Sequence, residues 1–268
     1  MFGFTGCSGP TITPATQGAD LSRLYWVVSQ SDLAFIQTAD PQIATRMLDG
    51  PSTYVLTEPS NTSAAVPSTH AVPTMLFTSY SIFISSLHDK AIRSDIRAVA
   101  YDPEFWPATP RDEQQNPLRY MDLFAIQARR SGYQPILVPG RDLALAPGGQ
   151  CAKQQSETLN TAYLRCGIAD AARFTPVFEI QCAPDELDIA ELRSFVAASV
   201  RQAHAANPSA VLIATLSTTP NGVHANSADL VRAAQAIAPI VRGFQLNMTS
   251  ATRWVAVDFL RAISGTGS

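Results

Sequence analysis

Short, almost continuously apolar runs recur along the chain, and between them apolar residues return every three or four positions. Continuous apolar runs of this length are typical of strands covered on both faces, and the 3–4 spacing is typical of amphipathic helices. The predicted strands are residues 24–29, 53–57, 73–78, 96–102, 134–140, 176–181, 210–216 and 243–248. The alternation predicts βα units on a parallel sheet.

Helices are predicted after nearly every strand. Thr109-Pro110 has the residue types of a helix start, and Asn116-Pro117 restarts a helix that stops at Gly132. Residues 58–72, rich in Pro, Asn and Ser, are predicted to form a loop in place of the second helix. The other predicted helices are residues 41–48, 81–92, 156–172, 189–206, 227–238 and 249–263.

Eight strands with these connections favour a closed (β/α)8 TIM barrel of the α/β class. The open-sheet alternative would place a Gly-rich phosphate loop after an early strand, and residues 25–32 contain neither GxGxxG nor GxxxxGK[ST]. The length of 268 residues suits one such domain. We expect a flexible N-terminal tail at 1–20 and a single barrel domain at 21–268.

Charge and hydropathy exclude some functions. The net charge is −3, which gives no basic surface for nucleic acid. No apolar run approaches the ~20 residues of a transmembrane helix. Residues 4–7 resemble the end of a bacterial lipoprotein signal with Cys7 as the acylated residue, and a disordered tail is the alternative. Cys151 and Cys166 could pair, which would suit a secreted protein, or remain buried free thiols.

Polar side chains close several predicted strands, and the active sites of such barrels lie at those carboxyl ends. Residues two apart share a strand face, so polar residues can be assigned in pairs. Strand five ends at Pro139-Gly140-Arg141-Asp142. The pairs are Asp102 with Glu104 on strand four, Glu179 with Gln181 on strand six, Thr215 with Ser217 on strand seven, and Gln245 with Asn247 on strand eight.

Asp102 and Glu104 form the central pair of this hypothesis. Two carboxylates at this spacing raise each other's pKa, so that one can stay protonated near neutral pH as a general acid. The alternative is a solvated strand end, with Asp102 bound by backbone amides. Glu179 lies within its strand, and its alternative role is a buried carboxylate paired with Arg141 or Arg173.

Aromatic residues near the predicted rim suit a carbohydrate ligand, because aromatic rings pack on the apolar faces of sugars. Tyr101 and Trp106 are the candidates, and the alternative for Trp106 is packing against the following helix. Arg141, Glu179, Gln181, Ser217, Gln245 and Asn247 are predicted to bind or support the substrate. The four histidines show no metal-ligand spacing, so we expect neither a metal nor a cofactor.

Residues 100–104, Ala-Tyr-Asp-Pro-Glu, resemble the end of the DxxDxDxE motif of chitinase-type glycoside hydrolases. The resemblance implies a (β/α)8 barrel in which Glu104 protonates the glycosidic oxygen and Asp102 orients the acetamido group of the substrate, which is the nucleophile. The first part of the motif is missing, and strand eight lacks the Trp of the chitinase sugar site. Residues 101–117 also resemble uncharacterised secreted actinobacterial barrels.

The resulting hypothesis is a secreted or lipid-anchored glycosidase-like enzyme for an oligo- or polysaccharide, with Glu104 as the acid and Asp102 as its partner. One alternative is a barrel that binds carbohydrate without cutting it. Another is a lyase or isomerase of small-molecule metabolism, which would need a metal or phosphate site. The barrel fold alone does not choose among them.

Overall fold

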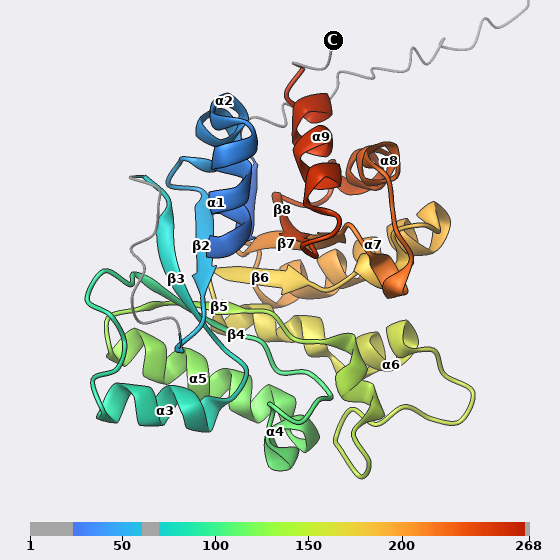
Figure 1. Ribbon diagram of the computed structural model, residues 1–268. Coiled ribbons are helices and arrows are strands. Elements are labelled where there is room, and N and C mark those ends of the chain that lie inside the picture. The colour runs from blue at the N-terminus through green and yellow to red at the C-terminus, as the bar shows by residue number, and fades with distance from the viewer. Residues whose placement is uncertain (1–23, 61–69, 266–268) are drawn as a thin grey trace, which may run out of the picture.

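The computed structural model describes residues 24–60 and 70–265 as a closed barrel of eight parallel strands (Figure 1). Each strand pairs with its neighbour in sequence, and β8 closes the barrel on β1. The strands are β1 (Tyr25–Ser29), β2 (Thr53–Thr57), β3 (Val72–Phe77), β4 (Ala98–Tyr101), β5 (Gln134–Leu137), β6 (Val177–Ile180), β7 (Val211–Ser217) and β8 (Gly243–Asn247). The predicted fold class and all eight predicted strands are confirmed.

Alternation along the strands creates two cores. One set of side chains fills the barrel interior, including Ala98, Ala100 and Ile213. The intervening positions, such as Val99 and Phe244, pack outward against the helices in a larger core. Each strand residue is therefore assigned to the interior or to the helix layer by its parity.

The helices lie outside the strands, and several begin at a residue whose side chain caps the helix (Figure 1). Ser79 caps α3, Asp188 caps α7, and Asn226 forms a capping box with Asp229 at α8. The helices are α1 (Gln30–Ala39), α2 (Pro41–Ile43), α3 (Tyr80–His88), α4 (Arg111–Gln115), α5 (Pro117–Arg130), α6 (Leu159–Cys166), α7 (Ile189–Ala206), α8 (Ser227–Ile237) and α9 (Arg253–Ile263). Pro117 occupies the first turn of α5, as predicted.

The first helix differs from the prediction. The chain enters α1 directly after β1, because the Ser29 hydroxyl accepts a hydrogen bond from the Asp32 N–H. The predicted helix at 41–48 is present as α2 and a π-helix, Ala44–Leu48, that follow α1. The predicted helix at 156–172 is also divided. It breaks at Gly167, which has a φ of 76°, into α6 and a 3-10 helix, Ile168–Phe174.

Two further corrections concern helix starts. Pro110, and not Thr109, occupies the cap position of α4, and the Thr109 hydroxyl instead donates to the Thr78 carbonyl. α9 begins at Arg253, four residues after the predicted start. Most of the predicted loop at 58–72 and the whole predicted tail at 1–20, with Cys7, lie outside the described residues.

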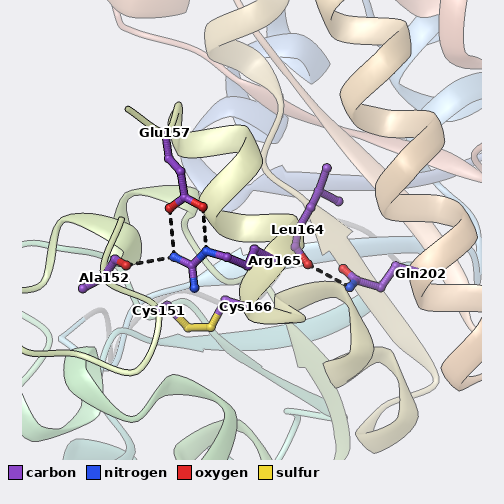
Figure 2. Close-up of a disulfide and its surroundings, with 7 residues drawn as sticks. All are labelled: Cys151, Ala152, Glu157, Leu164, Arg165, Cys166 and Gln202. Carbon is purple, nitrogen blue, oxygen red and sulfur yellow. Dashed lines mark hydrogen bonds and ion pairs between the residues drawn. A yellow bond between two sulfur atoms is a disulfide. The ribbon is translucent and has the colours of Figure 1, made fainter. Parts of the chain in front are cut away.

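A disulfide joins Cys151 to Cys166 and fastens the long β5–α6 connection to the end of α6 (Figure 2). Beside it, Arg165 donates to both carboxylate oxygens of Glu157, at 2.6 and 2.9 Å, and to the Ala152 carbonyl at 2.9 Å. Of the two alternatives for these cysteines, pairing is the one observed. Arg141 and Asp142 belong to this connection, shortly after the end of β5.

Candidate active site

The carboxyl ends of the strands bring several interior-facing polar residues together. Glu179 belongs to β6, Thr215 to β7 and Gln245 to β8, and Thr215 lies beside Gln245 in the strand register. Asp102 follows β4 directly, and its N–H continues the ladder by donating to the Phe77 carbonyl at 2.9 Å. Small residues, Ala98 and Ala100, lie below it in the barrel. Polar groups thus occupy the top of an otherwise apolar interior.

Asp102 and Glu104 share one side-chain partner. Gln181 donates from Nε2 to Asp102 Oδ1 at 2.9 Å and to the Val138 carbonyl at 3.0 Å. The Glu104 backbone N–H donates to Thr109 Oγ1 at 3.2 Å. Gln181 also hydrogen-bonds the Glu104 carboxyl, so one amide connects the two acids, and Glu104 lines a cavity.

Asp142 joins this pair and was not assigned a role from the sequence. Asp142 lies two residues after Gly140. A Cβ placed on Gly140 would lie 2.4 Å from Asp142 Oδ1 and 2.9 Å from Glu104 Cγ, so both acids approach this glycine closely. Asp142 Oδ1 is buried without a hydrogen-bond partner. Asp142 is the last residue of the motif that ends the predicted fifth strand, and this position was the available signal. Its placement near Glu104 depends on a turn of the chain that the sequence does not reveal.

Glu179 is fully buried and forms no ion pair with any cationic side chain of residues 24–60 and 70–265. Thr215 Oγ1 donates to its Oε1 at 2.6 Å, and the Gln245 amide nitrogen, turned toward Glu179, donates to Oε2 and Oε1 at 2.6 and 3.0 Å. Arg141 instead pairs with Asp185 at 2.6 Å, and Arg173 lies over Phe174. The alternative of an ion pair with Arg141 or Arg173 is therefore wrong.

Burial raises the pKa of every acid in this cluster, and repulsion between carboxylates adds to the rise at Asp102, Glu104 and Glu179. Burial, followed by the charge of Glu104, raises the pKa of Asp102 well above its usual value. Burial and Asp142 raise the pKa of Glu104, and burial raises that of Asp142. Burial raises the pKa of Glu179 to about 8. No ion pair between described residues includes any of the four, so protons can remain on the cluster at neutral pH.

A cavity of about 220 Å³ gives solvent access to Glu104 and Asp142. Glu104, Asp142, Gln181 and Arg141 line it, together with Asn221 of the β7–α8 loop. The Arg141 guanidinium also donates to Asn160 Oδ1 at 2.5 Å. Asp102 and Glu179 are not among the lining residues and lie below the cavity floor. The arrangement can deliver a proton from Glu104 to a bound group while buried acids adjust its affinity for that proton.

Tyr101 does not reach this cavity, which corrects the prediction that it binds substrate. It has the opposite strand parity from Asp102, is fully buried, and stacks on Phe124 of α5. Its hydroxyl donates to Glu113 Oε2 at 2.7 Å. Glu113, which sequence analysis missed, also accepts from the N–H of Tyr80 at 2.7 Å and so holds the start of α3. Tyr101 is a structural residue of the helix layer.

The other residues predicted to bind substrate lie at separate places around the carboxyl ends of the strands, which form the mouth of the barrel. Trp106 is 39% exposed and its indole N–H donates to Thr109 Oγ1 at 3.0 Å. Ser217 is buried, and its hydroxyl accepts from the Thr219 N–H in the turn after β7. Asn247 is exposed at the end of β8, 3.2 Å from the Gln245 side chain. Their contacts with a ligand remain predictions.

The described residues contain neither a metal-binding cluster nor a membrane-spanning helix. Over residues 24–60 and 70–265, no group of three or more His, Cys, Asp and Glu side chains is arranged to hold a metal ion. None of the helices described there has the length and apolar character that crossing a bilayer requires.

Comparison with known proteins gives structural similarity only. No protein-family model and no curated protein matches the sequence. Among solved structures, a candidate alpha-L-fucosidase from Bacteroides thetaiotaomicron aligns over 100% of both chains with a TM-score of 0.56 and 9% identity. A pyruvate carboxylase of Rhizobium etli aligns over 91% of this chain and 28% of its own, with a TM-score of 0.48 and 9% identity. At 9% identity, the similarity to the first of these structures shows a shared fold alone.

Proposed function

We propose that this protein is a glycoside hydrolase-like enzyme for an oligo- or polysaccharide, with Glu104 as its general acid. The observation that carries the proposal is that Glu104 lines a solvent-accessible cavity while burial and the neighbouring Asp142 raise the pKa of its carboxyl. A carboxylic acid that keeps its proton near neutral pH can protonate a leaving oxygen. Whole-chain similarity to a candidate fucosidase supports a barrel of suitable shape.

Asp102 is assigned the role of orienting the substrate or stabilising positive charge at the sugar carbon. Its bond from Gln181 fixes it beneath the cavity, and the charges of Glu104 and Glu179 act on it. Gln181 and Arg141 line the cavity and are the nearest candidates to bind sugar hydroxyls. Glu179, Gln245, Ser217 and Asn247 support this floor and rim.

The resemblance to chitinase-type enzymes supplies a balanced reaction. Glu104 donates its proton to the glycosidic oxygen, the bond from that oxygen to the sugar carbon breaks, and the acetamido oxygen of the substrate bonds to that carbon. Water then opens the ring formed in this way and returns a proton to Glu104. The route needs no enzymic nucleophile, and β7 ends in Thr215-Leu216-Ser217 without a carboxylate.

The test is Glu104→Gln, which keeps the shape of the side chain and removes the proton. Hydrolysis of unactivated glycans should fall by about 10²-fold or more. Dinitrophenyl glycosides, whose leaving group needs no protonation, should retain much more of their rate. Asp258→Asn, the same chemical change on the exposed face of α9, is the control. Equal losses on both substrate types would contradict the role of Glu104.

A carbohydrate-binding barrel without catalysis is the second candidate. It is favoured by the position of Asp102, which lies below the cavity and not among its lining residues. In that case the native protein would bind glycans and leave them intact, and Glu104→Gln would alter affinity alone.

We also propose that the protein works outside the cytoplasm, and the Cys151–Cys166 disulfide supports this location. Acylation at Cys7 would anchor it to a membrane. Cell fractionation of the native protein and of Cys7→Ala tests both parts, since loss of membrane association in the variant is expected only for a lipid anchor.

A further inference from the structure

A second and larger cavity, of about 400 Å³, opens at the same end of the barrel. Residues that follow β2, β3 and β4 line it, among them Glu58, Ser60, Ile82 and Trp106. The cavity of Glu104 is bounded instead by segments that follow β4 to β7. Both are open to solvent, and the volume of the larger falls within the ~300–1,000 Å³ typical of small-molecule sites.

The segment that follows β4 separates the two cavities. Glu104 lines the smaller cavity, and Trp106, two residues later, lines the larger one. Thr109 Oγ1 accepts from the Glu104 N–H at 3.2 Å and from the Trp106 indole N–H at 3.0 Å, and it donates to the Thr78 carbonyl at 2.9 Å. One hydroxyl thus fixes the acid and the indole ring relative to each other and to the end of β3.

The lining of the larger cavity combines apolar surface with polar groups. Ile82 is 44% exposed and Trp106 is 39% exposed, so both offer apolar area to a ligand. Glu58 and Ser60 lie at the same cavity and can bind hydroxyl groups. An apolar ring face beside hydroxyl-binding groups matches the two kinds of surface that a sugar presents.

Exposed apolar side chains also mark this end of the molecule. Every large hydrophobic residue that is exposed in the described part of the chain lies between a strand and the next α-helix or in the first turn of that helix. They are Ile82, Phe105, Trp106, Leu145, Leu187, Val223 and Trp254. Of these side chains, Ile82 and Trp106 line the larger cavity, and the others lie outside both cavities.

We propose that the Ile82–Trp106 cavity is a sugar-binding subsite separate from the cavity of Glu104, and that the substrate is a chain that occupies both and is cut at an internal linkage. This inference rests on the proposed function. An enzyme that removes terminal sugars needs a blind pocket on one side of its acid, whereas here a solvent-open cavity lies on each side of the Glu104–Trp106 segment.

The experiment uses the full chain and reducing-end-labelled oligosaccharides of two to six sugars prepared from chitin, cellulose and bacterial cell-wall glycan. With the series that is cleaved, kcat/KM should rise about 10-fold or more with chain length, and internal fragments should appear first. Trp106→Ala should remove this gain, and a 10-fold loss corresponds to about 1.4 kcal/mol of binding free energy. Trp254→Ala is the matched control, because Trp254 is 55% exposed but lines neither cavity.

The outcomes separate the two proposals. Cleavage at equal rates for two and six sugars, release of single terminal sugars, or equal losses in Trp106→Ala and Trp254→Ala would overturn the subsite and leave the hydrolase intact. Binding without cleavage would overturn the hydrolase, and the subsite would then be judged by whether Trp106→Ala alone weakens binding of the longer chains. No binding and no cleavage in any series would overturn both.

Discussion

Gly140 lies so close to Glu104 that a methyl group at position 140 would stand 2.9 Å from Glu104 Cγ. The backbone of Gly140 has φ −66° and ψ 139°, which any residue adopts. Glycine is required there by the close approach of two acids, because the same methyl group would lie 2.4 Å from Asp142 Oδ1. The side-by-side placement of Glu104 and Asp142 thus depends on one missing side chain.

Gly140→Ala should therefore displace both carboxyls and lower kcat/KM by about 10-fold or more. Overpacking costs about 1–3 kcal/mol of stability, which in a chain of this size lowers Tm by about 2–4 °C per kcal/mol. Gly50→Ala is the control, since a Cβ there meets nothing within 4 Å. Kinetics and thermal unfolding check the prediction, and unchanged kinetics in Gly140→Ala would show that the spacing of the two acids does not matter.

Tyr101→Phe should lower stability and spare substrate binding. The change removes one hydrogen bond to the buried Glu113, whose Oε2 keeps the bond from the Tyr80 N–H, and the loss of one such bond costs about 0.5–1.5 kcal/mol. Tyr120→Phe removes a similar bond to Asp112 at an exposed site and should cost much less. Denaturant unfolding and KM are the measurements. A large rise in KM without a loss of stability would show that Tyr101 contributes to substrate binding.

Two buried acids should make stability fall as the pH rises. Burial raises the pKa of Glu179 and of Glu186 to about 8, so the folded state holds protons that the unfolded chain releases near pH 4.5. Their contribution is fully present below that pH and is lost as the pH rises through about 8, at up to about 1.4 kcal/mol per pH unit for each group.

Glu179→Gln, which stays neutral at every pH, should flatten this dependence relative to the native protein. The difference in unfolding free energy between the two proteins, measured from pH 5 to pH 9, is the quantity to compare. A difference that does not change across this range would mean that Glu179 is ionised in the folded state.

The disulfide should contribute to stability through the chain that it closes. Cys151 and Cys166 are 15 residues apart, and a loop of this length corresponds to about 3 kcal/mol. Reducing agent should lower Tm in the native protein and leave the Cys151→Ser/Cys166→Ser variant unchanged. A similar fall in both proteins would mean that the reductant does not act through this disulfide and would contradict the prediction.

Much of the fold could be predicted because strands buried on both faces are continuously apolar. α1 was missed for the opposite reason, since its buried side includes Gln30 and Asp32, which interrupt the apolar periodicity. Strand parity located Glu179 and Gln245. Tyr101 was predicted to contact a sugar from its aromatic character, although its parity, opposite to that of Asp102, places it in the helix layer. Asp142 could not be placed, because β5 ends at Leu137 and the chain turns before reaching it.

The apolar side chains at the ends of the strands give the molecule two unlike ends. In the described part of the chain, the exposed large hydrophobic side chains lie at the carboxyl ends of the strands, among them Trp106, Leu187 and Val223. This end is therefore the more apolar of the two. When the protein meets an insoluble material, adsorption should turn it mouth first, so that the acids face the solid before any specific contact forms. The orientation of the protein on a surface then follows from the distribution of its apolar side chains and does not require a separate attachment domain.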